Sequence, residues 1–219
     1  KDGSLQFEQI PARLLHFTPK WYGREQTTKF VKGKAQQTAS AFSFSGTWTI
    51  GKQEFQLNET IRQTAPDQVE YSAKVRAADP IPTQELSLSF QLPLEILKKK
   101  TIFVNGETIR YADIPSRKNN RWFNDLDSLT IEFPEGKLEI SGKPFKALLQ
   151  DNRAFAVKNA KESPGTYTLR LYPQDGDPKA GTEASFQYSF KFRGITSVPL
   201  DLGKAANRAF RDERSGDGK

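Results

Sequence analysis

Apolar and polar residues alternate along most of the chain. From residue 42 to residue 50 every second position belongs to one set, Phe42, Phe44, Gly46, Trp48 and Ile50, and serine or threonine stands between them. This period of two is typical of a β-strand with one buried face, because successive side chains point to opposite sides of the sheet. The same pattern predicts strands near residues 55–61, 69–75, 86–92, 102–111, 129–140, 167–171 and 186–192.

Turn signals separate these segments. Asn105-Gly106 stands between two short apolar runs, and this dipeptide is the strongest short-range signal for a two-residue hairpin. Pro134-Glu135-Gly136 marks a second hairpin, and Gly51-Lys52 marks a further turn. Helical patterns are confined to residues 93–98 and 200–211. The pattern therefore predicts an all-β chain, folded as an antiparallel two-sheet β-sandwich of jelly-roll type or larger.

The alternation also predicts the core and the domain boundary. No internal repeat, glycine-serine linker or charge boundary divides the chain, so one domain over residues 1–196 is expected. Residues 197–219 end in a polar stretch with glycines, which is typical of a linker, and are expected to form a short C-terminal extension. The side chains expected to be buried are Phe42, Phe44, Trp48, Leu88, Phe90, Ile131, Leu169, Leu171, Phe190 and Phe192.

Composition excludes several kinds of chemistry. The 219 residues include no cysteine and one histidine, which excludes disulfides, thiolate metal sites, cysteine nucleophiles and two-histidine metal motifs. No nucleophile elbow, phosphate-binding loop or dinucleotide-binding glycine pattern is present. Asp175-Gly176-Asp177 has two carboxylates that calcium could use, but the EF-hand pattern is missing, so an exposed turn is expected. We therefore expect no catalytic residue, no metal site and no cofactor.

The formal net charge is +7, from 33 lysines and arginines against 26 acidic residues. Such a charge favours solubility, and it also suits an acidic polysaccharide or a nucleic acid as a partner. Lys98-Lys99-Lys100 is the only compact basic run, and no RNA-binding aromatic motif accompanies it, so nucleic acid is not expected. No window approaches the roughly 18 consecutive apolar residues of a membrane helix, so no membrane partner is expected either.

Two clusters combine adjacent aromatic residues with polar ones. Trp21 and Tyr22 lie between Pro19 and Gly23, where a loop would expose both rings. Residues 117–125 are polar apart from a central aromatic pair and are expected to form a loop between two strands. Aromatic faces suit the apolar faces of sugar rings, while amide and guanidinium groups bind sugar hydroxyls. The residues predicted to bind a glycan are Trp21, Tyr22, Arg121, Trp122, Phe123 and Asp151.

Each of these predictions has a structural alternative. One of Trp21 and Tyr22 could close the end of the sandwich instead. Trp122 could cap the core beneath the aliphatic stems of neighbouring arginines. Asp151 follows an apolar strand and lies two residues before Arg153, so these two side chains either pair with each other or bind a ligand.

Several segments resemble the N-terminal β-sandwich accessory domains of large secreted bacterial glycoside hydrolases. They include Val104-Asn105-Gly106-Glu107, Leu138-Glu139-Ile140-Ser141-Gly142, Leu149-Gln150-Asp151-Asn152-Arg153 and residues 197–213, within a resemblance that covers roughly residues 40–219. The resemblance implies a non-catalytic module that is secreted, outside the cell or in the periplasm. Its implied partners are polysaccharides or oligosaccharides and other domains of the same polypeptide. No binding residue is transferred by the resemblance.

Three functions follow as hypotheses. The first is a carbohydrate-binding accessory module of a polysaccharide-degrading enzyme, which raises the local enzyme concentration on its substrate. The second is a structural spacer that packs on a catalytic domain through an apolar patch. The third is a jelly-roll polysaccharide lyase acting on an acidic glycan, for which His16, Tyr22 and Arg24 form the only compact set. His16 continues the apolar run Leu14-Leu15, which favours a structural role, so we expect the isolated chain to be non-catalytic.

Overall fold

The computed structural model describes residues 12–17, 23–25, 31–50, 53–78, 83–93, 102–104, 107–109, 114–133, 136–155, 166–176 and 183–194. Within this part of the chain nearly every residue lies in a β-strand. The strands are β1 (Ala12–Phe17), β2 (Gly23–Glu25), β3 (Val31–Gln37), β4 (Ala41–Ile50), β5 (Gln53–Ala65), β6 (Gln68–Ala77), β7 (Glu85–Pro93), β8 (Ile102–Val104), β9 (Glu107–Ile109), β10 (Arg121–Phe133), β11 (Gly136–Asp151), β12 (Thr166–Leu171) and β13 (Glu183–Arg193). Two short 3-10 helices of the described part are η2 (Arg117–Asn119) and η3 (Asn152–Phe155).

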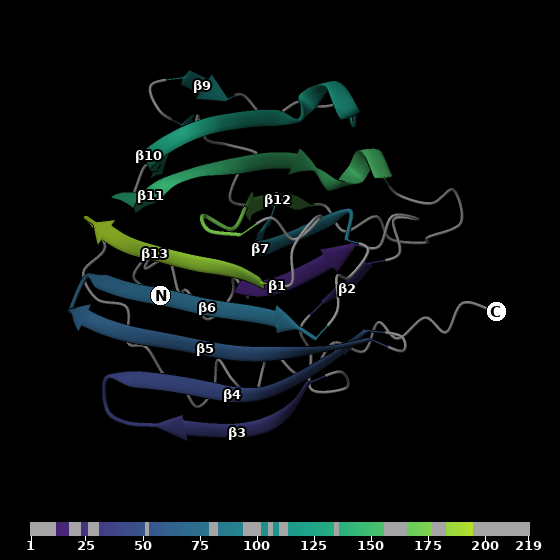
Figure 1. Ribbon diagram of the computed structural model, residues 1–219. Helices are drawn as coiled ribbons and strands as arrows, with labels where there is room; N and C mark the ends of the chain where they lie inside the picture. The colour runs from purple at the N-terminus through teal and green to yellow at the C-terminus, as the bar shows by residue number, and fades with distance from the viewer. Residues whose placement is uncertain are drawn as a thin grey trace.

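All thirteen strands belong to one antiparallel network that folds over on itself. The main path runs β2-β1-β7-β12-β11-β13-β6-β5-β4-β3, and β10 pairs with β11 beside it. Residues 137–142 of the long strand β11 pair with β13, whereas residues 147–151 pair with β12. Strand β11 and its partner β10 therefore belong to two sheets. Figure 1 shows β10 and β11 above the succession β13, β6, β5, β4 and β3.

We call β13, β6, β5, β4 and β3 the large sheet, and β12, β7, β1 and β2 the small sheet. Their inner faces pack against each other through aromatic side chains. The His16 ring of β1 lies 5.4 Å from the Phe55 ring of β5, and the Phe90 ring of β7 lies 5.5 Å from the Phe190 ring of β13. These contacts join the two sheets, so the predicted antiparallel two-sheet β-sandwich is confirmed.

The predicted core is largely confirmed. Trp48, Leu88, Phe90, Ile131, Leu169, Leu171, Phe190 and Phe192 are buried. The prediction is wrong for Phe42 and Phe44, which are only half-buried. They lie in the first half of β4, next to the exposed strand β3 at one end of the large sheet, whereas Trp48 near the other end of β4 contacts His16. A period of two identifies the inner face of a strand but not how far the opposite sheet covers it.

The predicted hairpins are confirmed. Val104 pairs with Glu107 and Ile50 pairs with Gln53, so two residues make each connection. Phe133 pairs with Gly136 in the hairpin of β10 and β11. Of the helical turn predicted at residues 93–98, Pro93 is the last residue of β7, and residues 94–98 lie outside the described residues. The helical turn predicted at residues 200–211 and the extension at residues 197–219 also lie outside them. Among the helices that the structure describes, none has the length and apolar character needed to span a membrane.

The outer face of the large sheet carries exposed charges that pair across neighbouring strands. Glu183 of β13 lies 2.6 Å from the Lys74 ammonium and 2.7 Å from the Arg76 guanidinium of β6. Arg62 of β5 lies 3.0 Å from Glu70 of β6. Alternation explains this face on β6, because Glu70, Lys74 and Arg76 each stand between buried apolar neighbours.

Candidate functional site

Two large apolar side chains are exposed in the part of the chain that the structure describes. Ile114 is 78% exposed and Trp122 is 57% exposed. They lie at the two ends of the segment 114–122, which contains η2 and the first residues of β10. We take this segment as the candidate site, because it carries both exposed large apolar side chains of the described residues, and one of them is an indole flanked by polar groups.

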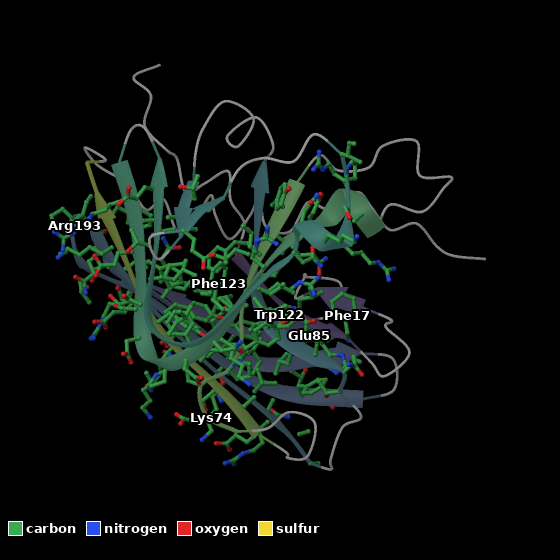
Figure 2. The ribbon with its side chains drawn as sticks, turned by 90° about the horizontal axis from the view of Figure 1, so that it is seen from above. Phe17, Lys74, Glu85, Trp122, Phe123 and Arg193 are labelled. Carbon is green, nitrogen blue, oxygen red and sulfur yellow. The ribbon has the colours of Figure 1, made fainter. Side chains whose placement is uncertain are left out.

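The loop predicted over residues 117–125 is wrong in its second half. Residues 121–125 belong to β10, and the connection before the strand consists of residues 114–120. Trp122 and Phe123 are adjacent in a strand, so they point to opposite faces. Phe123 packs against the core, and Trp122 lies on the outer face of the sandwich (Figure 2). The prediction failed because the pairing register shifts on both sides of Leu126 and Asp125 has a φ of 52°, which interrupts the period of two.

Trp122 stacks on Tyr172. Their ring centroids lie 5.5 Å apart at an interplanar angle of 31°. Tyr172 directly follows β12, and its backbone N–H donates to the carbonyl of Lys146 at 3.0 Å. The tyrosine ring therefore supports one part of the indole and leaves the rest exposed to solvent. We call Trp122 and Tyr172 the aromatic platform.

A buried ion pair lies beside the platform on the outer face of the small sheet. Arg170 Nη1 of β12 donates to both carboxylate oxygens of Glu85 in β7, at 2.9 and 3.0 Å. The Ser87 hydroxyl donates to the same carboxylate at 3.0 Å, and the Arg170 guanidinium lies 5.1 Å from the centre of the Phe17 ring. Figure 2 shows Trp122, Glu85 and Phe17 in one region of the molecule, away from Lys74 and Arg193.

This ion pair affects the Tyr172 hydroxyl. Burial raises the pKa of Tyr172, and the nearby Glu85 charge raises it further, while Arg170 acts in the opposite direction. The hydroxyl therefore stays protonated at neutral pH. Neither this hydroxyl nor Arg170 Nε makes a hydrogen bond of normal geometry to any residue that the structure describes. The outer face of the small sheet thus holds two buried polar atoms close to the platform, Tyr172 Oη and Arg170 Nε, with the Glu85 carboxylate beside them.

Asp151 fixes the connection that precedes Trp122. Its side chain is fully buried, and its oxygens accept from Asn119 Nδ2 at 2.8 Å and from the Ser116 backbone N–H at 3.4 Å. Arg153 donates through Nε at 2.8 Å and through Nη2 at 2.9 Å. The Asp151 backbone N–H donates in return to Asn120 Oδ1 at 3.0 Å.

These bonds keep Asp151 charged. Burial alone would raise the pKa of its carboxyl, but the hydrogen bonds from Arg153 and Asn119 outweigh burial and lower the pKa. Of the two alternatives stated for Asp151 and Arg153, the structure shows the pair. Because protein donors occupy both carboxylate oxygens, the structure places Asp151 beneath the connection as its anchor rather than on the exposed surface.

Exposed cations surround the platform. Arg121 directly precedes Trp122, and its Nη1 donates to the carbonyls of Lys118 at 3.1 Å and Asn120 at 3.4 Å. Lys146 lies two residues before Leu148, the cross-strand partner of Trp122, and its side chain is exposed on the same face. Arg121 and Lys118 therefore lie at the start of β10, and Lys146 lies on the same face as Trp122.

The structure brings only part of the predicted site together. Arg121, Trp122 and Asp151 meet at one end of the β10–β11 pair, whereas Phe123 faces the core. The predictions for Trp21 and Tyr22 lie outside the described residues. The structure adds Tyr172, Arg170, Glu85, Ile114 and Lys146, which sequence reasoning missed. The arginine between Leu169 and Leu171, the glutamate before Leu86, and the serines between Leu86, Leu88 and Phe90 were the available signal of a polar outer face.

His16 lies in the core. Its side chain is fully buried, Nε2 lies 3.1 Å from the Thr83 hydroxyl, and its ring contacts Trp48 and Phe55. Burial lowers the pKa of His16 to about 4, so the ring is neutral at pH 7. Arg24 pairs with His16 in β2, and Tyr22 lies outside the described residues. The structural role favoured by the sequence agrees with this placement.

No three metal-binding side chains of the described residues lie close enough together to hold an ion. Asp175, one of the two carboxylates considered for calcium, lies 3.0 Å from the Lys143 ammonium. Its backbone also pairs with Ser185 in an isolated bridge. Asp177 lies outside the described residues.

Comparison with known proteins gives a similarity in structure alone. No protein-family model and no curated protein matches the sequence. Among solved structures, the chain is similar to a protein assigned as an aldose 1-epimerase from Escherichia coli K12, with 12% identity, a TM-score of 0.44, and coverage of 74% of this chain and 68% of that chain.

Two further structures are similar at the same level. A 4-alpha-glucanotransferase from Thermococcus litoralis has 11% identity, a TM-score of 0.43, and coverage of 84% of this chain and 27% of that chain. A galactose mutarotase related enzyme from Lactobacillus acidophilus has 9% identity, a TM-score of 0.43, and coverage of 76% of this chain and 73% of that chain. These values are too low to carry a conclusion about the ligand or reaction of this chain.

Proposed function

We propose that this chain is a non-catalytic carbohydrate-binding module and that the aromatic platform is its sugar-stacking surface. The observation that carries the proposal is the exposed indole of Trp122, which is held in place from one side by Tyr172. The apolar C–H face of a pyranose packs on such a ring, and neighbouring polar groups fix the orientation of the sugar. Arg121 and Lys118 supply donors for sugar hydroxyls at the edge of the platform.

The residues around the platform are held in place by contacts within the fold, so that few of them need to be ordered when a ligand binds. The buried Asp151–Arg153 pair holds the connection before Trp122, and β10 pairs with β11 directly at Trp122. Few side chains then need to be immobilised when a ligand binds, which lowers the entropic cost of association. The proposal includes a secreted or periplasmic polysaccharide-degrading parent protein, which the segments cited under Sequence analysis support.

Affinity electrophoresis tests the proposal. The protein is run through gels that contain soluble β-glucan, xylan, mannan or acidic polysaccharide, and thermal unfolding is measured in parallel. We expect retardation by at least one glycan, loss of retardation in Trp122→Ala, and partial retention in Trp122→Tyr, which keeps an aromatic face. Wild-type protein that migrates freely in every gel would overturn the proposal, and no variant is then needed.

A structural spacer is the second candidate, and Ile114 favours it. An aliphatic side chain that is 78% exposed does not stack on sugars, and together with Trp122 it provides an apolar contact for a neighbouring domain. Ile114→Ser separates the two functions. It should leave glycan retardation unchanged if Trp122 binds sugar, and it should weaken domain association in the longer polypeptide if the segment is a domain contact.

A further inference from the structure

We infer that the aromatic platform selects anionic glycans, in which carboxylate or sulfate groups recur along the chain. The inference rests on the proposed function and names the substrate class of the same site. It follows from the charges around Trp122, where exposed cations gather while the neighbouring buried carboxylates are already bound by other side chains.

Three cations lie around the platform. Arg121 and Lys118 lie at the start of β10, and Lys146 lies beside Tyr172 on the outer face of β11. All three side chains are exposed. Within the described part of the chain, none of them forms an ion pair with a carboxylate.

The buried carboxylates near the platform do not neutralise these cations. Asp151 is bound by Arg153, and Glu85 is bound by Arg170. Asp125 is the exposed carboxylate nearest to Trp122 along β10, and it lies at the irregular position opposite Lys146 without forming an ion pair with a described residue. The immediate charge of the platform is therefore positive.

The outer face of the large sheet provides the contrast. There Lys74, Arg76 and Arg62 each lie within 3.0 Å of a glutamate oxygen. The exposed cations near Trp122 have no such partner among the described residues, which leaves a positive potential directed at solvent. An anionic group on a sugar stacked at Trp122 would meet Lys146, which lies on the same face of the β10–β11 pair.

The test compares glycans that differ only in charge. Polygalacturonate is paired with its methyl ester, and a sulfated galactan is paired with its desulfated form, each in affinity gels at low and high salt. We expect retardation by an anionic form and at least tenfold weaker retardation by its neutral counterpart, with a strong decrease at high salt. Retardation by the polyuronate alone assigns carboxylate, and retardation by the sulfated galactan alone assigns sulfate.

Variants separate a site from general charge attraction. The triple variant Lys118→Gln, Arg121→Gln, Lys146→Gln should lose about tenfold in affinity for the anionic glycan. The charge-matched control Lys32→Gln, Lys34→Gln, Lys74→Gln removes the same charge from the large sheet and should bind like wild type. Equal losses in the two triple variants would overturn the inference, as would binding that Trp122→Ala leaves unchanged.

The remaining outcomes distinguish this inference from the proposed function. Equal retardation by charged and neutral forms, abolished by Trp122→Ala, would overturn the anionic preference and leave the carbohydrate-binding function intact. Absence of retardation by all four glycans and by the neutral glucans, xylans and mannans would overturn both.

Discussion

The two outer faces of this sandwich use charge in opposite ways. On the large sheet, Lys74, Arg76 and Glu183 are exposed and pair with one another across strands. On the small sheet, Arg170 and Glu85 are buried, and an aromatic ring, Trp122, is exposed beside them. A surface that serves solubility exposes charge and hides apolar groups. On the small sheet the charged pair is buried, and the exposed group beside it is an indole.

The energetic consequences of the two arrangements differ as well. An exposed ion pair contributes about 0–1 kcal/mol, because water screens the charges and the long side chains lose freedom. Removing one partner of a buried pair costs about 3–5 kcal/mol, because the remaining charge stays in a medium that does not solvate it. Substitutions at equivalent arginines on the two faces should therefore have very different effects.

The largest expected effect is that of Arg170→Met, compared with Arg76→Met. Arg170→Met leaves the Glu85 carboxylate buried without its main donor, and it should lower the melting temperature by about 6–15 °C. Arg76→Met removes one of two cations from exposed Glu183 and should change it by less than about 3 °C. Differential scanning calorimetry measures both. Equal shifts would show that the small sheet does not depend on its buried charges.

A smaller effect is expected for Asp151→Asn. The change removes the carboxylate charge that Arg153 binds and should lower the free energy of unfolding by about 2–3 kcal/mol at pH 7. The pKa of Asp151 in the folded state is lower than its ordinary value of 3.8. Its stabilising contribution is therefore fully present above pH 3.8 and is lost as the pH falls through the folded-state pKa.

Urea unfolding from pH 7 to pH 3 measures this dependence. The difference in unfolding free energy between wild type and Asp151→Asn should be constant near neutrality and shrink at the acidic end. A difference that stays constant to pH 3 would contradict a charged, stabilising Asp151. Asp67→Asn, which makes the same change to a carboxylate in the turn between β5 and β6, is the matched control.

Trp122→Ala should have a modest effect on stability. The exposed indole loses its stacking on Tyr172, a contact worth about 0.5–1.5 kcal/mol, so the melting temperature should fall by about 2–5 °C. Trp48→Ala removes a fully buried indole and should cost about 3–5 kcal/mol or prevent folding. If thermal unfolding gave equal losses for the two tryptophans, Trp122 would be a core residue and the platform would not exist.

The sequence was sufficient to predict the strands, because the period of two persists through β4, β6, β7 and β13 and the hairpin connections carry their own turn residues. The burial of individual side chains was harder to predict from the sequence. Phe42 and Phe44 alternate as regularly as Trp48, but their exposure depends on how far the small sheet extends over β4. The small sheet therefore determines the exposure of Phe42 and Phe44, and most of its strands lie far from β4 along the sequence.

The candidate site shows the same limit. Trp122 and Arg121 could be singled out because they stand together in a polar stretch, and Asp151 because it follows an apolar strand. Tyr172 and Glu85 could not, since Arg170 and Glu85 are 85 residues apart and meet only through the pairing of β12 with β7. The register shifts around Leu126 also explain why the start of β10 was not predicted, because the period-of-two rule assumes unbroken alternation.

The smallest expected effect is that of Tyr172→Phe, compared with Tyr71→Phe. The Tyr71 hydroxyl donates to Glu59 at 2.9 Å, so its removal should lower the free energy of unfolding by about 1 kcal/mol. The buried Tyr172 hydroxyl makes no hydrogen bond of normal geometry to a described residue, so its removal should leave stability unchanged or raise it by up to about 1 kcal/mol. The phenyl ring still supports Trp122, and glycan retardation should therefore equal that of wild type.

Urea unfolding and affinity electrophoresis measure the stability and the glycan retardation of these variants on the same samples. A stability loss as large as that of Tyr71→Phe would show that the hydroxyl is bonded within the fold, and weaker retardation at unchanged stability would show that it bonds directly to the sugar.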